Sequence, residues 1–124
     1  MVREFVRLSE FEKRCKEIGL NEENVREIEN ILLDNPFAGD IIQGTGGIRK
    51  FRYALPGRGK SGGARIISLD IAHFERTYLI TAYEKGEKET LTKAERNALK
   101  KLSKALEDSE KERHARLEKG TSIK

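Results

Sequence analysis

Apolar residues recur along the chain at two different spacings, and these spacings predict both strands and helices. Apolar and charged side chains interleave over residues 2–7, which predicts an edge strand. In residues 25–32 the apolar side chains lie three, four or seven positions apart, so we expect an amphipathic helix that ends before Asn35-Pro36. A shorter helix over residues 9–18 is expected to end at Gly19. The two helices should form a hairpin that packs on a sheet.

Three predicted helix starts carry polar side chains that can accept hydrogen bonds from free backbone N–H groups. These N-caps are Ser9, with Glu12 completing a capping box, Asn21, and Thr92, with Glu95 completing a second box. The last N-cap begins a helix with an apolar stripe formed by Leu99, Leu102 and Leu106. We expect residues 108–124, of which nine of seventeen are charged, to form a charged, frayed extension of a single domain spanning 1–124.

Three β-rich segments lie between the helices. Residues 48–55 and 64–71 flank the glycine-rich segment 56–63, so they are expected to pair as a hairpin. Residues 74–83 predict a third strand. One side of that strand is expected to carry Phe74, Tyr78, Ile80 and Ala82. The order is therefore an N-terminal strand, a helical hairpin, a three-stranded antiparallel meander and a C-terminal helix. This pattern is typical of an α+β domain with its helices packed on one face of the sheet and the other face open.

Composition limits where the protein works. The only cysteine, Cys15, excludes an internal disulfide and any cysteine-based zinc site, so we expect no metal and a reducing compartment. No apolar run approaches the ~18 residues that a membrane-spanning helix needs. We therefore expect a cytoplasmic protein that does not associate with a membrane.

The charge is unevenly distributed. The net charge is +4, yet the stretch between Asp40 and Asp70 has no acidic residue and carries +6, so the rest of the chain sums to −2. The six cations of this stretch are Arg49, Lys50, Arg52, Arg58, Lys60 and Arg65. A concentrated basic segment on an acidic body favours a phosphate-rich partner. The alternative is a solvated sheet edge that is protected by its charges.

Residues 54–61 (ALPGRGKS) satisfy a relaxed phosphate-loop pattern, and residues 66–70 imitate the strand whose aspartate holds magnesium. A phosphate loop opens into a helix whose first N–H groups bind the phosphates. Here Gly62, Gly63 and a β-branched run follow, which leaves no room for that helix. We reject a nucleotide-binding loop and expect no cofactor and no small-molecule nucleotide.

A longer motif points to a family. The segment 39–65 (GDIIQGTGGIRKFRYALPGRGKSGGAR), with TAYEKGEKETLTKAE at 81–95, resembles the HigB/RelE toxins of bacterial type II toxin–antitoxin systems, most of all the HigB-type branch. The resemblance covers residues 1–106 in order of elements. It implies a RelE-like fold and a metal-independent endoribonuclease, an mRNA interferase that arrests growth. Such a toxin cleaves translated mRNA in the ribosomal A site. The implied partners are a cognate helix-turn-helix antitoxin and the ribosome with its mRNA.

The resemblance also implies a site. Arg65 is the residue expected to clamp the scissile phosphate, because a guanidinium presents a planar fork to phosphate oxygens. The remaining catalytic candidates are Lys60, Lys85 and Tyr83, and the candidates for binding flanking RNA are Lys50, Arg52, Arg58 and Lys88. A lysine or tyrosine whose pKa is lowered by these cations is expected to act as general base, and Tyr83 is our choice. Strict alternation places Tyr83 on the face opposite Tyr78. The alternative for Tyr83 is a packed tyrosine without a catalytic role.

Other functions stay open at this point. A ParE-like branch of the superfamily poisons DNA gyrase, and a non-catalytic relative would only bind RNA or an antitoxin. Ser68 and Leu69 stand where family members often carry an aromatic pair, which puts the packing of the site in question. A metal-free nuclease often uses two histidines, but His73 and His114 lie outside the motif, and we expect both to be surface residues.

Overall fold

Five strands form one mixed sheet in the order β1-β5-β4-β3-β2. The structure is a computed structural model of the chain that describes residues 3–55, 63–87 and 91–122, with side chains up to residue 118. The strands are β1 (Glu4–Arg7), β2 (Asp40–Ile41), β3 (Arg49–Ala54), β4 (Gly63–Ile71) and β5 (Arg76–Glu84). The helices are α1 (Ser9–Ile18), α2 (Glu22–Asp34), the short 3-10 helix η1 (Ala72–Phe74) and α3 (Lys93–Ser122). β1 pairs in parallel with β5, and the other pairs are antiparallel.

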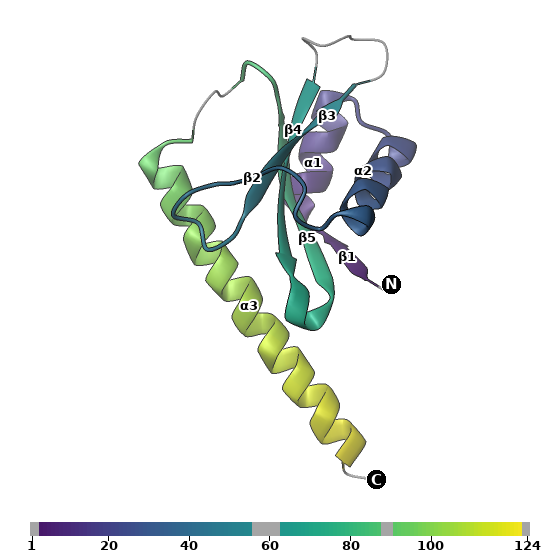
Figure 1. Cartoon of the computed structure of the whole chain (residues 1–124), viewed down its shortest axis with the longest axis vertical. Coiled ribbons are helices and arrows are strands. Elements are labelled where there is room, and N and C mark those ends of the chain that lie inside the picture. The colour runs from purple at the N-terminus through teal and green to yellow at the C-terminus, as the bar shows by residue number, and fades with distance from the viewer. Residues whose placement is uncertain (1–2, 56–62, 88–90, 123–124) are drawn as a thin grey trace.

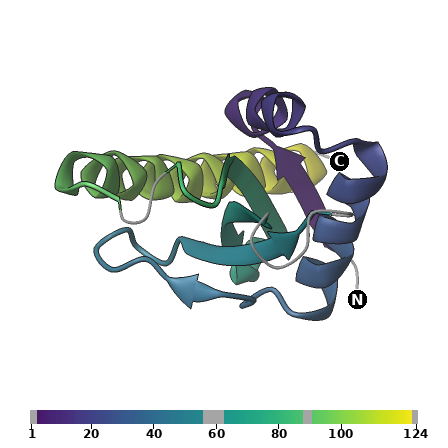
Figure 2. The same ribbon diagram turned by 90° about the horizontal axis from the view of Figure 1, so that it is seen from above.

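The α+β fold class and the order of elements are confirmed, with β2 as an addition at the outer edge beside β3 (Figure 2). The placement of the helices differs from the prediction. One buried cluster joins α1 and α2 to Phe51, Ile66 and Leu79, whereas the other joins α3 to Ile67 and Ile80. Figure 1 shows α1 and α2 on one side of the sheet and α3 on the other. Both faces are covered because β4 and β5 carry apolar residues at consecutive positions.

Helix ends agree with the predicted caps in two of three cases. Asn21 and Asn24 form a reciprocal capping box, and Thr92 and Glu95 form another with bonds of 2.9 and 3.1 Å. The predicted box at Ser9 is wrong: α1 begins at Ser9 itself, and its N-cap is Leu8, which makes no side-chain cap. The Leu8 N–H instead donates to the carbonyl of Leu79 at 3.0 Å, so strand pairing continues to the first turn of the helix.

A register shift in β5 changes which side chains share a face. Ile67 pairs with Thr81 and Ser68 with Leu79, so β5 has one extra residue at Ile80. As a result Tyr83 packs on the same face as Tyr78, and Ala82 packs on the other. Strict alternation predicted the reverse for both Tyr83 and Ala82, and both predictions are wrong.

α3 is longer than predicted. It continues past residue 108 to Ser122, and Figure 1 shows it extending beyond the end of the β4–β5 hairpin. Glu110 is only 2% exposed, and its carboxylate accepts hydrogen bonds from the Tyr78 hydroxyl and from Arg76, the latter at 2.7 Å. The helix is therefore not frayed at this point. Within the part of the chain that the structure describes, no helix combines the length and the apolar character needed to cross a bilayer.

The glycine-rich motif has a structural role in positioning β3. Gly39 has φ +86°, and a Cβ on it would lie 2.1 Å from the backbone oxygen of Lys50, so only glycine fits beside β3. Further along the loop, the Ser103 hydroxyl donates to the Gly46 carbonyl at 3.3 Å. The loop between β2 and β3 therefore rests on α3.

Candidate nucleic-acid interface

Three neighbouring strands bring the predicted basic residues to one face of the sheet. Arg65 on β4 pairs with Arg52 on β3 and with Tyr83 on β5. Residues paired in this way have Cα atoms about 4.5–5.5 Å apart. Lys50 pairs with Ile67, two positions from Arg65, so it shares that face. We call Lys50, Arg52 and Arg65 the basic face. As predicted, Phe51, Tyr53 and Leu55 are buried on the opposite side of β3.

Arg65 has a buried guanidinium nitrogen without an acceptor, as Arg76 also has, but unlike Arg76 it forms no ion pair with a described carboxylate. Its Nη1 atom is buried, and no residue of the described chain gives it a hydrogen-bond acceptor. The atom lies 4.0 Å from the position that a Cβ on Gly63 would take, so the guanidinium folds along β4 over that glycine. A buried donor without an acceptor costs about 1–3 kcal/mol. An oxyanion bound at this position would remove that cost, which makes Arg65 suited to bind a phosphate.

The basic face also lacks counter-charges. Within residues 3–55, 63–87 and 91–118, no carboxylate forms an ion pair with Lys50, Arg52 or Arg65. Arginines elsewhere behave differently, since Arg7 pairs with two glutamates and Arg76 with two more. Arg52 and Arg65 stand directly opposite one another, and such like-charged cross-strand pairs are destabilising. A bound polyanion would relieve this repulsion.

Tyr83 lies next to the basic face, but its acidity differs from the prediction. Burial raises the pKa of the Tyr83 hydroxyl, and the positive charge of Arg65 offsets the rise only in part. The expectation of a lowered pKa is wrong, because the phenol is packed between β5 and α3 and loses hydration. Tyr83 is therefore a neutral phenol at pH 7, which suits it to donate a proton or a hydrogen bond.

The other predicted site residues are less well placed or lie outside the description. Lys85 is exposed just beyond β5, and its N–H donates to the Gly63 carbonyl at 2.9 Å, which keeps it at the same end of the sheet as Arg65. Arg58, Lys60 and Lys88 lie outside the described residues. Their roles stay predictions.

The remaining sequence expectations concern histidines, metals and site packing. His73 and His114 are exposed as expected, and both contact the ring of Phe74 in η1. η1 follows the C-terminal end of β4, whereas Arg65 lies near the N-terminal end of that strand. Among the described side chains, no group of three or more His, Cys, Asp or Glu residues is arranged to hold a metal ion. Ser68 and Leu69 are both buried, so the absence of an aromatic pair leaves no exposed gap at these positions.

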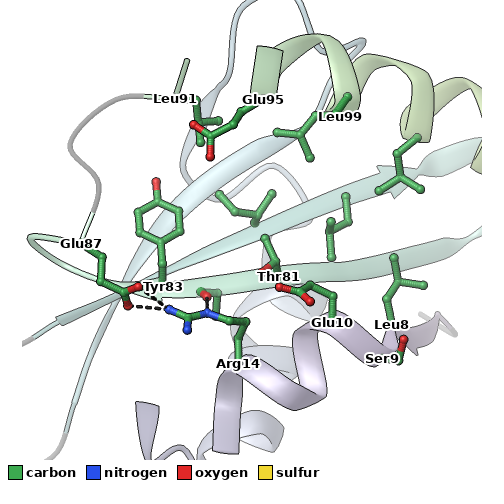
Figure 3. A pocket seen from close by; sticks show the side chains of 15 residues that line it. Leu8, Ser9, Glu10, Arg14, Thr81, Tyr83, Glu87, Leu91, Glu95 and Leu99 are labelled. Carbon is green, nitrogen blue, oxygen red and sulfur yellow. Dashed lines mark hydrogen bonds and ion pairs between the residues drawn. The ribbon is translucent and has the colours of Figure 1, made fainter. Parts of the chain in front are cut away.

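Sequence reasoning missed a groove on the other side of Tyr83. It has a volume of about 680 Å³ and lies between the start of α1, the middle of β5 and the first turns of α3 (Figure 3). Leu8, Ile80 and Leu99 are among the apolar residues that line it, and Tyr83 stands at its edge. Because its walls are distant in the sequence, no local pattern could have indicated it.

Comparison with models of protein families identifies what kind of protein carries this site. Residues 4–124 match the family described as the RelE toxin of the RelE/RelB toxin–antitoxin system. The match spans nearly the whole chain, and the strand order with its two helical layers agrees with a RelE-like fold. The protein is therefore a member of the RelE toxin family, the toxin component of a toxin–antitoxin system that pairs with an antitoxin.

Proposed function

We propose that this toxin is a metal-independent endoribonuclease that cleaves translated mRNA in the ribosomal A site. The observation that carries the proposal is the basic face: three cations on adjacent strands without ion-pair partners among the described residues, one of them with a buried, unpaired Nη1. A single-stranded RNA backbone provides the oxyanions that these groups lack. Membership of the RelE family supports the same activity, because its toxins are generally endoribonucleases.

RNA supplies its own nucleophile for this reaction. The 2′-hydroxyl gives its proton to a water molecule as its oxygen attacks the adjacent phosphorus, the new 2′-O–P bond forms, and the bond to the 5′-oxygen breaks. The products are a 2′,3′-cyclic phosphate and a 5′-hydroxyl end. In the proposed arrangement Arg65 holds the non-bridging oxygens as their charge grows, and Arg52 and Lys50 bind flanking phosphates. Tyr83, a neutral phenol, donates a proton to the leaving 5′-oxygen.

The described residues offer no histidine pair for the two proton transfers, so the protein alone is a poor catalyst on free RNA. The ribosome supplies the missing part by holding an extended codon with its 2′-oxygen in line for attack. This division of work explains why the proposed substrate is translated mRNA. The proposed partner that restrains the toxin is a helix-turn-helix antitoxin encoded beside it.

Replacement of Arg65 tests the proposal. We expect Arg65→Ala to lower the rate of cleavage on translating ribosomes by about 10²-fold or more, with the fold retained. The matched control is Arg26→Ala, which removes a guanidinium that is 72% exposed on α2 and should leave cleavage unchanged. Primer extension locates the cuts, and end-labelling by polynucleotide kinase without prior dephosphorylation identifies 5′-hydroxyl ends.

Three results would contradict the proposal. Equal cleavage by Arg65→Ala and wild type would remove Arg65 from the site. Equal cleavage rates on free and on translated RNA would show that cleavage does not depend on the ribosome. Intact messages together with loss of DNA supercoiling in the presence of gyrase would favour a gyrase poison instead.

A further inference from the structure

We propose that the groove beside Tyr83 docks an apolar, basic-flanked segment of the antitoxin, and that the docked segment covers Tyr83. The proposal rests on the function proposed above, because only a catalytic Tyr83 makes this docking inhibitory. That an antitoxin binds follows from membership of the family, whereas the place and chemistry of the contact come from the groove itself.

The groove is apolar and open. Its floor is formed by side chains of β4 and β5, including Ile67 and Ile80. Its walls carry three leucines: Leu8, which precedes α1, Leu91, which precedes α3, and Leu99 within α3. The three leucines remain only partly buried in the free chain. Their burial by a partner would remove further apolar surface from water, at about 25 cal/mol for each Å².

The rim of the groove is acidic. Among the described residues that line it, Glu10, Glu87 and Glu95 are acidic and Arg14 is the one cation. The Arg14 guanidinium is already satisfied, because it donates to the Ala82 carbonyl at 2.9 Å and to Glu87 at 2.5 Å. By contrast, the Glu10 carboxylate has no hydrogen bond or ion pair with any described residue, and Figure 3 shows it beside Thr81 over the groove. A partner with Lys or Arg beside its apolar residues complements this rim.

The same charges argue against RNA as the occupant. Phosphates in this groove would approach three carboxylates. The basic face lies on β4 and β3, so Tyr83 on β5 stands between it and the groove. The occupant also cannot add a strand, because β5 is hydrogen-bonded on both sides, to β1 and to β4. We therefore infer a segment that docks through its side chains, such as an amphipathic helix, rather than by strand addition.

Affinity for the antitoxin tests the proposal without using cleavage as the readout. The probe is the purified product of the open reading frame next to the toxin gene. Its binding to the full toxin chain is measured by calorimetry, with every toxin variant also carrying Arg65→Ala. Arg65 does not line the groove, so this substitution leaves the proposed docking surface unchanged. Glu10→Lys reverses the unpaired rim charge, and its matched control is Glu23→Lys, an exposed residue of α2. Ala98→Arg fills the groove, and its matched control is Ala105→Arg, also exposed on α3 but outside the groove.

We expect each groove variant to weaken binding by about tenfold or more and each control to change it by less than about twofold. With Arg65 restored, the groove variants should keep their ribosomal cleavage and escape neutralisation by the antitoxin. Thermal melts establish that all variants fold. Unchanged affinity in both groove variants would overturn the proposal, as would the absence of any complex with the wild-type chain. Loss of cleavage with unchanged antitoxin affinity would assign the groove to RNA and also overturn it. Absence of cleavage by every form of the protein would refute the proposed function. The affinity measurements would still show whether the antitoxin docks in the groove.

Discussion

Replacement of Glu110 by alanine tests whether a buried polar network fixes α3 to the sheet. Glu110 Oε2 accepts from Arg76 Nη1 at 2.7 Å and from the Tyr78 hydroxyl, and Glu110 is almost fully buried. Removal of one partner of a buried ion pair costs about 3–5 kcal/mol, because the other charge is left uncompensated. Arg76 is 18% exposed and keeps Glu4 at 3.1 Å, so we place the expected loss near the lower limit, about 3 kcal/mol.

Urea unfolding measures this loss directly, and a thermal melt should show a decrease in Tm of about 10 °C. The matched control is Glu112→Ala, two residues along the same helix. Glu112 pairs with Arg116 at 3.4 Å, and both side chains are about 70% exposed, so that pair should contribute less than about 1 kcal/mol. Amide exchange in residues 107–118 should accelerate in Glu110→Ala and stay unchanged in the control.

The pH dependence gives a second readout of the same pair. Burial acts to raise the pKa of Glu110, but the hydrogen bonds from Tyr78 and Arg76 outweigh it, so the pKa lies below its ordinary value of 4.5. A lowered pKa in the folded state means that the stabilisation is present above pH 4.5 and is lost as the pH falls through the lowered value. The difference between wild type and Glu110→Ala should therefore shrink in acid. If Glu110→Ala costs no more stability than Glu112→Ala at pH 7, the network does not hold the helix.

Three further outcomes are expected. Asn21→Ala, which removes one half of the capping box, should lower the free energy of unfolding by about 1 kcal/mol in a urea titration. Cys15 is 4% exposed, and burial raises the pKa of its thiol to about 11, so thiol reagents at pH 8 should label it at the rate of unfolding; fast labelling would contradict this. Burial, followed by the hydrogen bond to Glu110, raises the pKa of Tyr78 to about 12, so its contribution to stability should be complete below pH 10 and decline between pH 10 and 12. Absorbance at alkaline pH, compared between wild type and Tyr78→Phe, checks this last expectation.

Local rules were sufficient wherever a residue's environment is set by its close neighbours in sequence. The N-cap at Asn21, the helix end at Gly19 and the burial of Phe51, Tyr53 and Leu55 all follow from spacing and residue type. The convergence of Lys50, Arg52 and Arg65 follows from the same alternation on two paired strands. For this reason much of the basic face could be predicted from the amino-acid sequence alone.

Features that depend on distant contacts were not predictable in this way. Glu110 lies in a charged stretch, and only its partners on β5 explain why it is buried. The extra residue at Ile80 reverses the faces of Ala82 and Tyr83, because one inserted position shifts every later side chain. The pKa of Tyr83 follows from that shift, since burial under α3 outweighs the influence of Arg65.

The parallel pairing of β1 with β5 has a consequence for biosynthesis. β1 is made first, yet the partner of Glu4 is Arg76, and the second sheet face stays bare until α3 exists. A nascent chain therefore cannot complete its hydrophobic core until its last third has left the exit tunnel, and pairings so distant in sequence form slowly. The sheet is thus completed only after β5 and α3 have both been made, so the chain reaches its final fold after the synthesis of these elements rather than alongside it.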